Sequence, residues 1–252
     1  MSLRDKVCVV TGGNSGIGRG VALKFAREGA KLAIAGRTPA TLQQVAGEIE
    51  VLGGTVDTFA MDVSDHEAVQ NVVKAVLDKY GRIDVLVNSA GGGSFHKRTL
   101  TTTPEDMQRS LNANLLGTIY FSQAVLPSML KAKEGTIINV SSGASYHPGL
   151  LGGMIYGAAK AGVDNFTRFL NVEFRNSGVR ACLVNPGEVD TPALSRNRPI
   201  PPSKEARQTM LTADDMGEAI ALIAGMPQRA HIQELVIRPT MQRDTSAETP
   251  PA

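Results

Sequence analysis

Residues 6–20, KVCVVTGGNSGIGRG, carry the most informative pattern in the chain. A short β-branched run, Lys6–Thr11, passes directly into a glycine-rich turn and then into a segment with helical periodicity. Gly12, Gly16 and Gly18 stand in G-x3-G-x-G spacing. Glycines there allow close approach to a pyrophosphate, and the N-terminus of the following helix presents N–H groups to the same anion. The pattern predicts the start of a dinucleotide-binding fold, with an ordinary glycine-rich turn as the alternative.

Short apolar runs alternate with longer helix-patterned segments along the rest of the chain. Most runs are apolar on both faces, as the strands of a helix-covered parallel sheet must be. The predicted strands are Lys6–Thr11, Lys31–Gly36, Thr55–Met61, Val85–Val87, Gly135–Val140, Arg180–Asn185 and Glu234–Ile237. The predicted helices are Gly16–Glu28, Thr41–Leu52, His66–Tyr80, Pro104–Lys131, Gly157–Asn176 and Asp214–Ala224. This alternation predicts an α/β fold: a doubly wound, Rossmann-type parallel sheet of about seven strands with helices on both faces.

The composition limits the classes of function. The 252 residues show no repeat or linker, so we expect one domain over residues 1–242 and a flexible polar tail over 243–252. The net charge of +2 argues against a nucleic-acid partner. Two cysteines and four histidines predict neither a disulfide framework nor a metal site. Since we find no secretion signal and no long apolar run, we expect a cytoplasmic protein without membrane contact.

The second predicted strand ends in LAIAGRT, residues 32–38. Dinucleotide folds that prefer NAD usually place a carboxylate here for the ribose hydroxyl. This chain instead has Gly36 followed by Arg37, and a guanidinium suits a 2′-phosphate through bidentate contacts. The position predicts NADP(H), with an exposed arginine at a helix start as the alternative.

Tyr156 and Lys160 stand four residues apart in YGAAK, which places both on one face of a helix. A phenol has a pKa of about 10, and a nearby ammonium favours the phenolate and lowers that pKa. The pair is a candidate general acid/base unit. Alone, this spacing is common and usually structural.

The pair does not stand alone, because six motifs follow one another in register. They are TGxxxGIG at 11–18, NSAG at 88–91, Asn114 in NANLLG, Ser141–Ser142 in INVSS, YxxxK at 156–160 and NPG at 185–187. With them the chain resembles the short-chain dehydrogenase/reductase family in its single-domain form, over roughly residues 5–225.

The resemblance implies an NADP(H)-dependent interconversion of a ketone and a secondary alcohol, with 3-oxo or 3-hydroxy acyl or acid compounds as candidate substrates. Tyr156 would act as the general acid/base, and Lys160 would lower the pKa of Tyr156 and hold the nicotinamide ribose. Ser142 would hydrogen-bond the substrate oxygen, and Asn114 would hold a water that relays protons to Lys160. The resemblance further implies a homodimer or homotetramer.

Cofactor contacts are implied at several places along the chain. Asp62 and Val63 would contact the adenine, and the backbone of 89–91 would contact the ribose. Asn88 would tie neighbouring strands together. The full predicted cofactor set is Gly12, Asn14, Ser15, Gly16, Ile17, Gly18, Arg37, Asp62, Val63, Ser89, Ala90, Gly91, Tyr156, Lys160, Pro186, Gly187, Val189 and Thr191.

One departure from the family pattern concerns the catalytic serine. The family's serine usually precedes its tyrosine by thirteen residues, whereas Ser142 precedes Tyr156 by fourteen. We therefore expect a one-residue insertion in the intervening loop, with Ser141 as the alternative serine and Ser145 after it.

Charged residues near the expected substrate pocket have two interpretations. Residues 192–210 correspond to the family's substrate lid. Its basic residues would attract an anionic substrate or belong to a solvated, mobile loop; they are Arg196, Arg198, Lys204 and Arg207. His96, Lys97 and Arg98 would line the cleft mouth or be exposed polar residues, and we favour exposure.

Two other functions compete with the dehydrogenase. A nucleotide-sugar epimerase or dehydratase would usually carry TGxxGxxG and a larger C-terminal substrate region. A non-catalytic NADP(H)-binding or redox-sensing protein would not need the set Asn114, Ser142, Tyr156 and Lys160.

Overall fold

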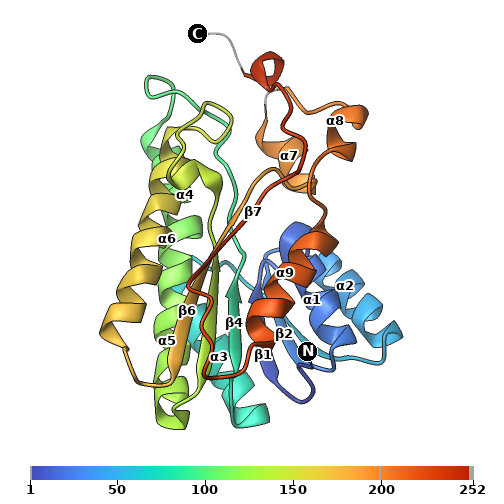
Figure 1. Ribbon diagram of the computed structural model, residues 1–252, viewed down its shortest axis with the longest axis vertical. Helices are drawn as coiled ribbons and strands as arrows, with labels where there is room; N and C mark the ends of the chain where they lie inside the picture. Colours follow the sequence, from blue (N-terminus) through green and yellow to red (C-terminus); the bar gives the residue numbers. More distant parts are fainter. Residues whose placement is uncertain (1, 199, 250–252) are drawn as a thin grey trace.

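The computed structural model describes residues 2–198 and 200–249 (Figure 1). Its strands are β1 (Val7–Thr11), β2 (Lys31–Gly36), β3 (Thr55–Ala60), β4 (Val85–Asn88), β5 (Gly135–Val140), β6 (Val179–Pro186) and β7 (Glu234–Ile237). Its α-helices are α1 (Gly16–Arg27), α2 (Pro39–Val51), α3 (His66–Tyr80), α4 (Pro104–Leu111), α5 (Gly117–Ala132), α6 (Met154–Glu173), α7 (Pro192–Asn197), α8 (Lys204–Gln208) and α9 (Ala213–Gly225). A π-helical turn, Asn112–Leu116, joins α4 to α5, and short 3-10 turns cover Gly143–Ser145 and Ser246–Glu248.

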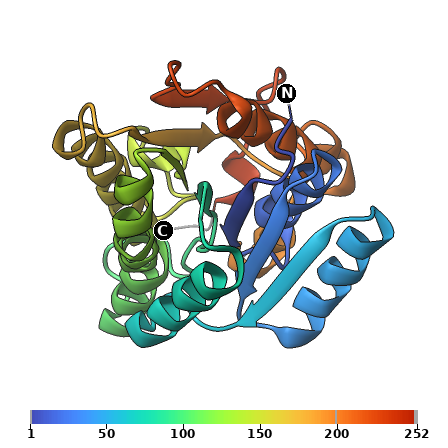
Figure 2. The same cartoon turned by 90° about the horizontal axis from the view of Figure 1, so that it is seen from below.

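The seven strands form one parallel sheet in the order β3-β2-β1-β4-β5-β6-β7. Figure 2 shows helices on both faces. One apolar core packs beneath α1, α2 and α9, and a second packs beneath α3, α5 and α6. The predicted doubly wound, Rossmann-type sheet is therefore confirmed.

The strand order changes direction between β1 and β4. From β1 the chain builds outward through β2 and β3, and from β4 it builds the other way. The loops that leave the carboxyl ends of these strands therefore separate, and a crevice opens there, as in other doubly wound sheets. This crevice holds the candidate site.

The structure differs from the sequence-based prediction in three segments. The predicted helix Pro104–Lys131 is interrupted by the π-turn, which has no glycine or proline at its start to signal it. Residues 192–210 include α7 and α8 rather than lacking regular structure. In the predicted flexible tail, Arg243 and Glu248 are largely buried and ion-paired, while 250–252 lie outside the described residues, as does 199 of the lid.

Two further observations concern the described part of the chain. No helix in it has the length and apolar character needed to cross a bilayer. No group of three or more His, Cys, Asp or Glu side chains within it could hold a metal ion.

Candidate active site

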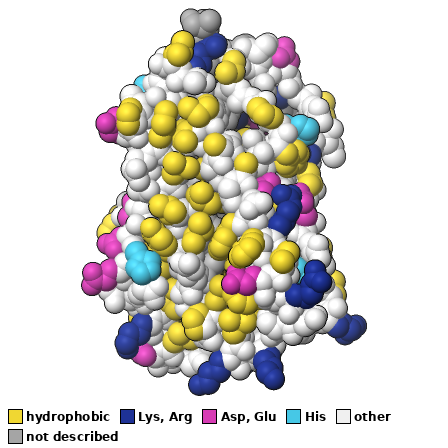
Figure 3. Space-filling view, turned by 90° about the vertical axis from the view of Figure 1, so that its left-hand side faces the viewer, with side chains coloured by type: hydrophobic (Ala, Val, Ile, Leu, Met, Phe, Trp, Pro, Cys, Tyr) yellow, Lys and Arg dark blue, Asp and Glu magenta, His cyan; other side chains and the backbone are white. Residues whose placement is uncertain are grey.

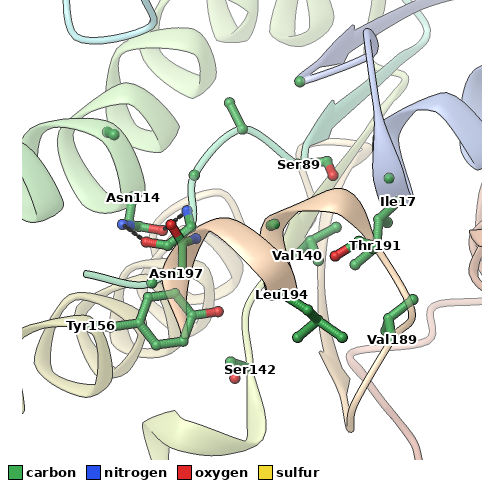
Figure 4. A pocket seen from close by; sticks show the side chains of 18 of the residues that line it. Ile17, Ser89, Asn114, Val140, Ser142, Tyr156, Val189, Thr191, Leu194 and Asn197 are labelled. Atoms are coloured by element: carbon green, nitrogen blue, oxygen red, sulfur yellow. Dashed lines mark hydrogen bonds between the residues drawn. The ribbon is translucent and has the colours of Figure 1, made fainter. Parts of the chain in front are cut away.

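A cleft of about 860 Å³ lies at the carboxyl ends of the strands, between the loops after β1, β4, β5 and β6 and the lid helix α7. Figure 4 shows Tyr156, Ser142, Asn114 and Asn197 at one end of it, and Ile17, Val189 and Thr191 at the other. Every predicted site residue except Gly18 lines this cleft.

The glycine-rich turn has the backbone shape that the spacing predicts. Gly12 (φ 67°) and Gly16 (φ 53°) adopt left-handed conformations that other residues rarely tolerate. Gly18 lies behind the turn, where a Cβ would clash with the Gly12 carbonyl, so its role is packing rather than direct contact. The Ser15 side chain does not cap α1, whose first turn has no acidic residue. The turn thus forms a cradle that fits a dinucleotide pyrophosphate.

The end of β2 borders the same cradle. Gly36 leaves space that the side chain of Asn14 occupies, and Asn14 donates a hydrogen bond to Thr41 (3.0 Å). Arg37 is exposed at the cleft edge. Burial by itself would raise the pKa of Asp62, but hydrogen bonds from Ser64 and the charge of Arg37 outweigh it and lower that pKa. A cation is therefore available beside the predicted adenine side.

The NSAG turn after β4 is held by Thr11, for which no site role was predicted from the sequence. The buried Thr11 hydroxyl accepts hydrogen bonds from the backbone N–H groups of Ser89 and Ala90 (both 3.1 Å). Those two N–H groups are therefore already hydrogen-bonded. The sequence feature that could have indicated this contact is the threonine that begins TGxxxGIG. Asn88 donates to Asn139 of β5 (2.9 Å), which confirms its predicted role as a tie between strands.

The three candidate serines differ in their surroundings. Ser145 donates to Asp164 (2.6 Å) and to the Ser142 carbonyl (2.8 Å). Successive residues of an extended chain point to opposite sides. Ser141 points away from the cleft, where its hydroxyl is hydrogen-bonded to Asp164 and Lys160. Ser142 lines the cleft together with Tyr156, and its hydroxyl oxygen accepts a hydrogen bond from the Ala144 N–H (3.2 Å). The longer loop therefore leaves Ser142 beside Tyr156.

Lys160 lies close to Tyr156, and its predicted effect on the Tyr156 pKa stays a prediction. Its ammonium is buried, lies 5.8 Å from the centroid of the Tyr156 ring and donates to the Val140 carbonyl (2.8 Å). Burial lowers the pKa of Lys160 to about 8, against the opposing charge of Asp164. Burial also raises the pKa of Tyr156, although the Ser142 hydrogen bond opposes this. Desolvation is thus the largest influence on the phenol pKa.

The π-turn places Asn114 in the cleft wall. Its side chain accepts from the Gly92 N–H (3.0 Å) and donates to the carbonyls of Gly92 (3.1 Å) and Ser110 (2.9 Å). These contacts bind the loop after β4 to the helix. They show Asn114 as a support of that loop, whereas its predicted water-holding role stays a prediction.

Two of the four basic residues in the segment 192–210 form ion pairs within the protein. Arg198 pairs with Glu188 (2.7 Å) and Glu248 (2.6 Å), and Arg243 bridges the same two carboxylates. Arg207 pairs with Asp190 (2.5 Å). Residues 243–248 are thereby tied to the lid, and we call Glu188, Arg198, Arg243 and Glu248 the lid clamp. The sequence analysis did not predict it, because its members are far apart in the chain.

The cleft can be compared with known proteins. The short chain dehydrogenase family model matches residues 6–200. A 3-oxoacyl-(acyl-carrier-protein) reductase of Thermotoga maritima is 37% identical over 217 residues, covering 86% of this chain and 85% of the relative. A metagenomic short-chain oxidoreductase crystallised with NADP has a TM-score of 0.83 at 32% identity, covering 96% of this chain and 100% of the other.

A second solved structure agrees. An alcohol dehydrogenase of Thermococcus sibiricus, complexed with 5-hydroxy-NADP, has a TM-score of 0.85 at 30% identity and covers 96% of this chain and 99% of its own. The glycine cradle, the tyrosine–lysine helix and these matches agree. The chain belongs to the short-chain dehydrogenase family and is an oxidoreductase of that family.

Proposed function

We propose that this protein is an NADP(H)-dependent oxidoreductase that interconverts a ketone and a secondary alcohol. The observation that carries the proposal is that the Ser142 hydroxyl, the Tyr156 phenol and the glycine cradle line one cleft. A hydroxyl donor and a titratable phenol at one end of a dinucleotide-sized groove suit a carbonyl group held between them.

Three residues of the cleft would have separate roles in the reaction. Bound NADPH would supply the hydride to the carbonyl carbon. Tyr156 donates its phenolic proton to the carbonyl oxygen. The carbon gains the hydride and the oxygen gains this proton, which gives the alcohol. Ser142 donates a hydrogen bond that orients this oxygen, and Lys160 restores a proton to Tyr156 from solvent. In the oxidative direction each proton moves the opposite way.

The direction of the Tyr156 pKa shift is consistent with a phenol that holds its proton at neutral pH. Because burial raises the pKa of Tyr156, the phenol keeps the proton that reduction consumes. Burial brings the pKa of Lys160 to about 8, so that this amine exchanges protons readily near neutral pH. Tyr156 is therefore better suited as an acid than as a base in this arrangement.

Arg37 supports NADP(H) over NAD(H), and two similar solved structures contain NADP or a derivative of it. We expect Arg37→Ala to raise the Kd for NADPH about 10- to 100-fold, because a charge-assisted pair with the 2′-phosphate is lost. The Kd for NADH should change less than about threefold. Fluorescence titration of both cofactors measures this, and equal losses would mean that Arg37 does not contact a 2′-phosphate.

A direct assay tests the reaction. The purified protein is mixed with NADPH or NADH and a panel of simple ketones, oxo acids and 3-oxoacyl thioesters, and cofactor oxidation is followed by absorbance. We expect stoichiometric alcohol from at least one compound with NADPH. Tight NADPH binding without oxidation across the panel would favour the non-catalytic binder, and epimerised sugar nucleotide without net oxidation would favour the epimerase.

We also infer that residues 192–210 act as a substrate lid and that the protein forms a homodimer through α5 and α6. Apolar side chains gather on the face shown in Figure 3. On α6, Phe169 (56% exposed) and Val172 (63% exposed) lie bare to solvent, which is costly unless a second copy covers them. Sedimentation equilibrium gives the assembly mass directly.

A further inference from the structure

A buried lysine lies at the substrate end of the cleft. Lys97 lies in the loop between β4 and α4 and is 5% exposed, although an exposed residue was expected there from the sequence. It lines the same cleft as Tyr156 and Ser142. None of the steps proposed for the reaction uses it.

The path of this side chain depends on Gly153, a glycine of the loop between Ser142 and Tyr156. Gly153 lets the stem of Lys97 pass, because a Cβ there would stand 3.0 Å from both Cα and Cδ of Lys97. The Met154 N–H donates to the Lys97 carbonyl (3.1 Å) and fixes the backbone. Gly152, the residue before Gly153, leaves open the space between Ala144 and the Tyr156 ring.

The ammonium reaches the cleft beside Gly93. Lys97 Nζ stands 3.3 Å from the point where a Gly93 Cβ would lie, and Asn197 Cβ stands 3.7 Å from that point. Figure 4 shows Asn197 at the same end of the cleft as Tyr156. A cation, an amide and the catalytic phenol therefore face one space.

Lys97 differs from the other buried cations around this cleft. Arg198 is held between Glu188 and Glu248, and Lys160 donates to a backbone carbonyl. Over the described residues, Lys97 Nζ has neither an ion pair nor a hydrogen bond within the chain. Burial lowers the pKa of Lys97 to about 8, and the charge of Arg198 adds to this. A buried ammonium without a partner is costly, and a bound anion would relieve that cost.

We propose that Lys97 binds the carboxylate of an oxo acid or hydroxy acid, with its carbonyl or hydroxyl carbon at Tyr156. This inference rests on the proposed function and names its substrate class. One unneutralised cation matches a monoanion, because the neighbouring Arg198 is already neutralised by two carboxylates. Lys97 is then a residue that determines specificity, not one that transfers a proton.

The test compares oxo acids of increasing chain length with their methyl esters. For the best acid, we expect Lys97→Met to lower kcat/KM about 100-fold, in line with a charged hydrogen bond lost from a buried site. The kcat/KM for the matching ester should change less than about threefold, and so should the Kd for NADPH. Lys74→Met, which removes an exposed lysine of α3 outside the cleft, is the charge-matched control and should behave like wild type.

Three outcomes would contradict the assignment. Equal losses for acid and ester in Lys97→Met would show a structural role. A loss of NADPH affinity as large as the loss for the acid would assign the ammonium to the cofactor. A wild-type enzyme that prefers esters to acids would show that no carboxylate is recognised.

Measurements of oxo-acid binding test the role of Lys97 independently of the proposed reaction. If wild type consumed NADPH with no compound, the proposed function would fail, and thermal shifts would then decide about Lys97. An oxo acid that raises the Tm of wild type but not of Lys97→Met supports the anion site. Equal shifts, or no shift for wild type with any acid, refute it. Lys97→Gln repeats each measurement should the Met variant fold poorly.

Discussion

The two ends of the cleft are built by different means. The cradle after β1 consists of backbone, and its shape follows from glycines a few residues apart in the chain. The substrate end consists of side chains, and the lid clamp joins Arg198 to Glu248 across 50 residues of sequence. The cradle presents a fixed set of N–H groups, whereas the substrate end can change its recognition by exchanging a few charges. The difference explains how one fold serves one class of cofactor and many substrates.

The largest effect should come from the backbone end. Gly18→Ala places a methyl group against the Gly12 carbonyl. The atoms that this methyl would meet belong to the backbone and cannot move aside. We expect it to abolish measurable NADPH binding and to lower the free energy of unfolding by about 3 kcal/mol. Chemical denaturation and cofactor titration measure the two effects.

Gly47→Ala provides the matched control, because nothing lies within 4 Å of the added methyl in the middle of α2. It should leave NADPH binding unchanged and stabilise the protein by about 0.5–1 kcal/mol through helix propensity. Should Gly18→Ala behave like Gly47→Ala, the close packing of the cradle would be disproved.

The contrast also explains which features the sequence could predict. The turn at Gly12 and Gly16 depends on local spacing, and the sheet depends on apolar runs, so both could be predicted. The Tyr156–Lys160 pair was recognisable for the same reason. The choice of Ser142 over Ser141 depends on which way each side chain leaves the end of β5, and counting residues across the loop cannot show this.

Other features depend on contacts between distant segments. Lys97 is buried because Gly153 admits its stem, and no periodicity near residue 97 indicates that. The raised pKa of Tyr156 follows from burial, whereas the sequence showed only the neighbouring lysine. The ordered part of the C-terminal segment depends on Arg243 and Glu248 meeting Glu188, and polar composition alone predicted a flexible tail.

The lid clamp should give the smallest effect. Glu248→Gln keeps the shape but removes the charge that Arg198 and Arg243 share. We expect a loss of about 1–3 kcal/mol in unfolding free energy and a rise of several-fold in substrate KM, with kcat little changed. Glu173→Gln, at an exposed site at the end of α6, is the control.

The pH dependence of the clamp has a defined sign. Hydrogen bonds from Arg243 lower the pKa of Glu248, and the arginines outweigh burial to lower the pKa of Glu188. Carboxylates with a lowered folded-state pKa stabilise above the unfolded pKa of about 4.3, and this stabilisation is lost as pH falls through the folded value. Glu248→Gln should therefore lose less stability than wild type on acidification. If the curves of Tm against pH were parallel for the two proteins, the clamp would contribute no pH-dependent stabilisation.

The most direct measurement of the proposed chemistry is single-turnover oxidation of NADPH by wild type and by Tyr156→Phe, with the best ketone of the panel. Removing the phenolic hydroxyl should slow hydride transfer about 100-fold or more, because the carbonyl oxygen loses its proton donor. The Kd for NADPH should stay within about threefold, since the ring and the glycine cradle remain. Transfer at the wild-type rate in Tyr156→Phe would contradict the assignment of Tyr156 as the acid.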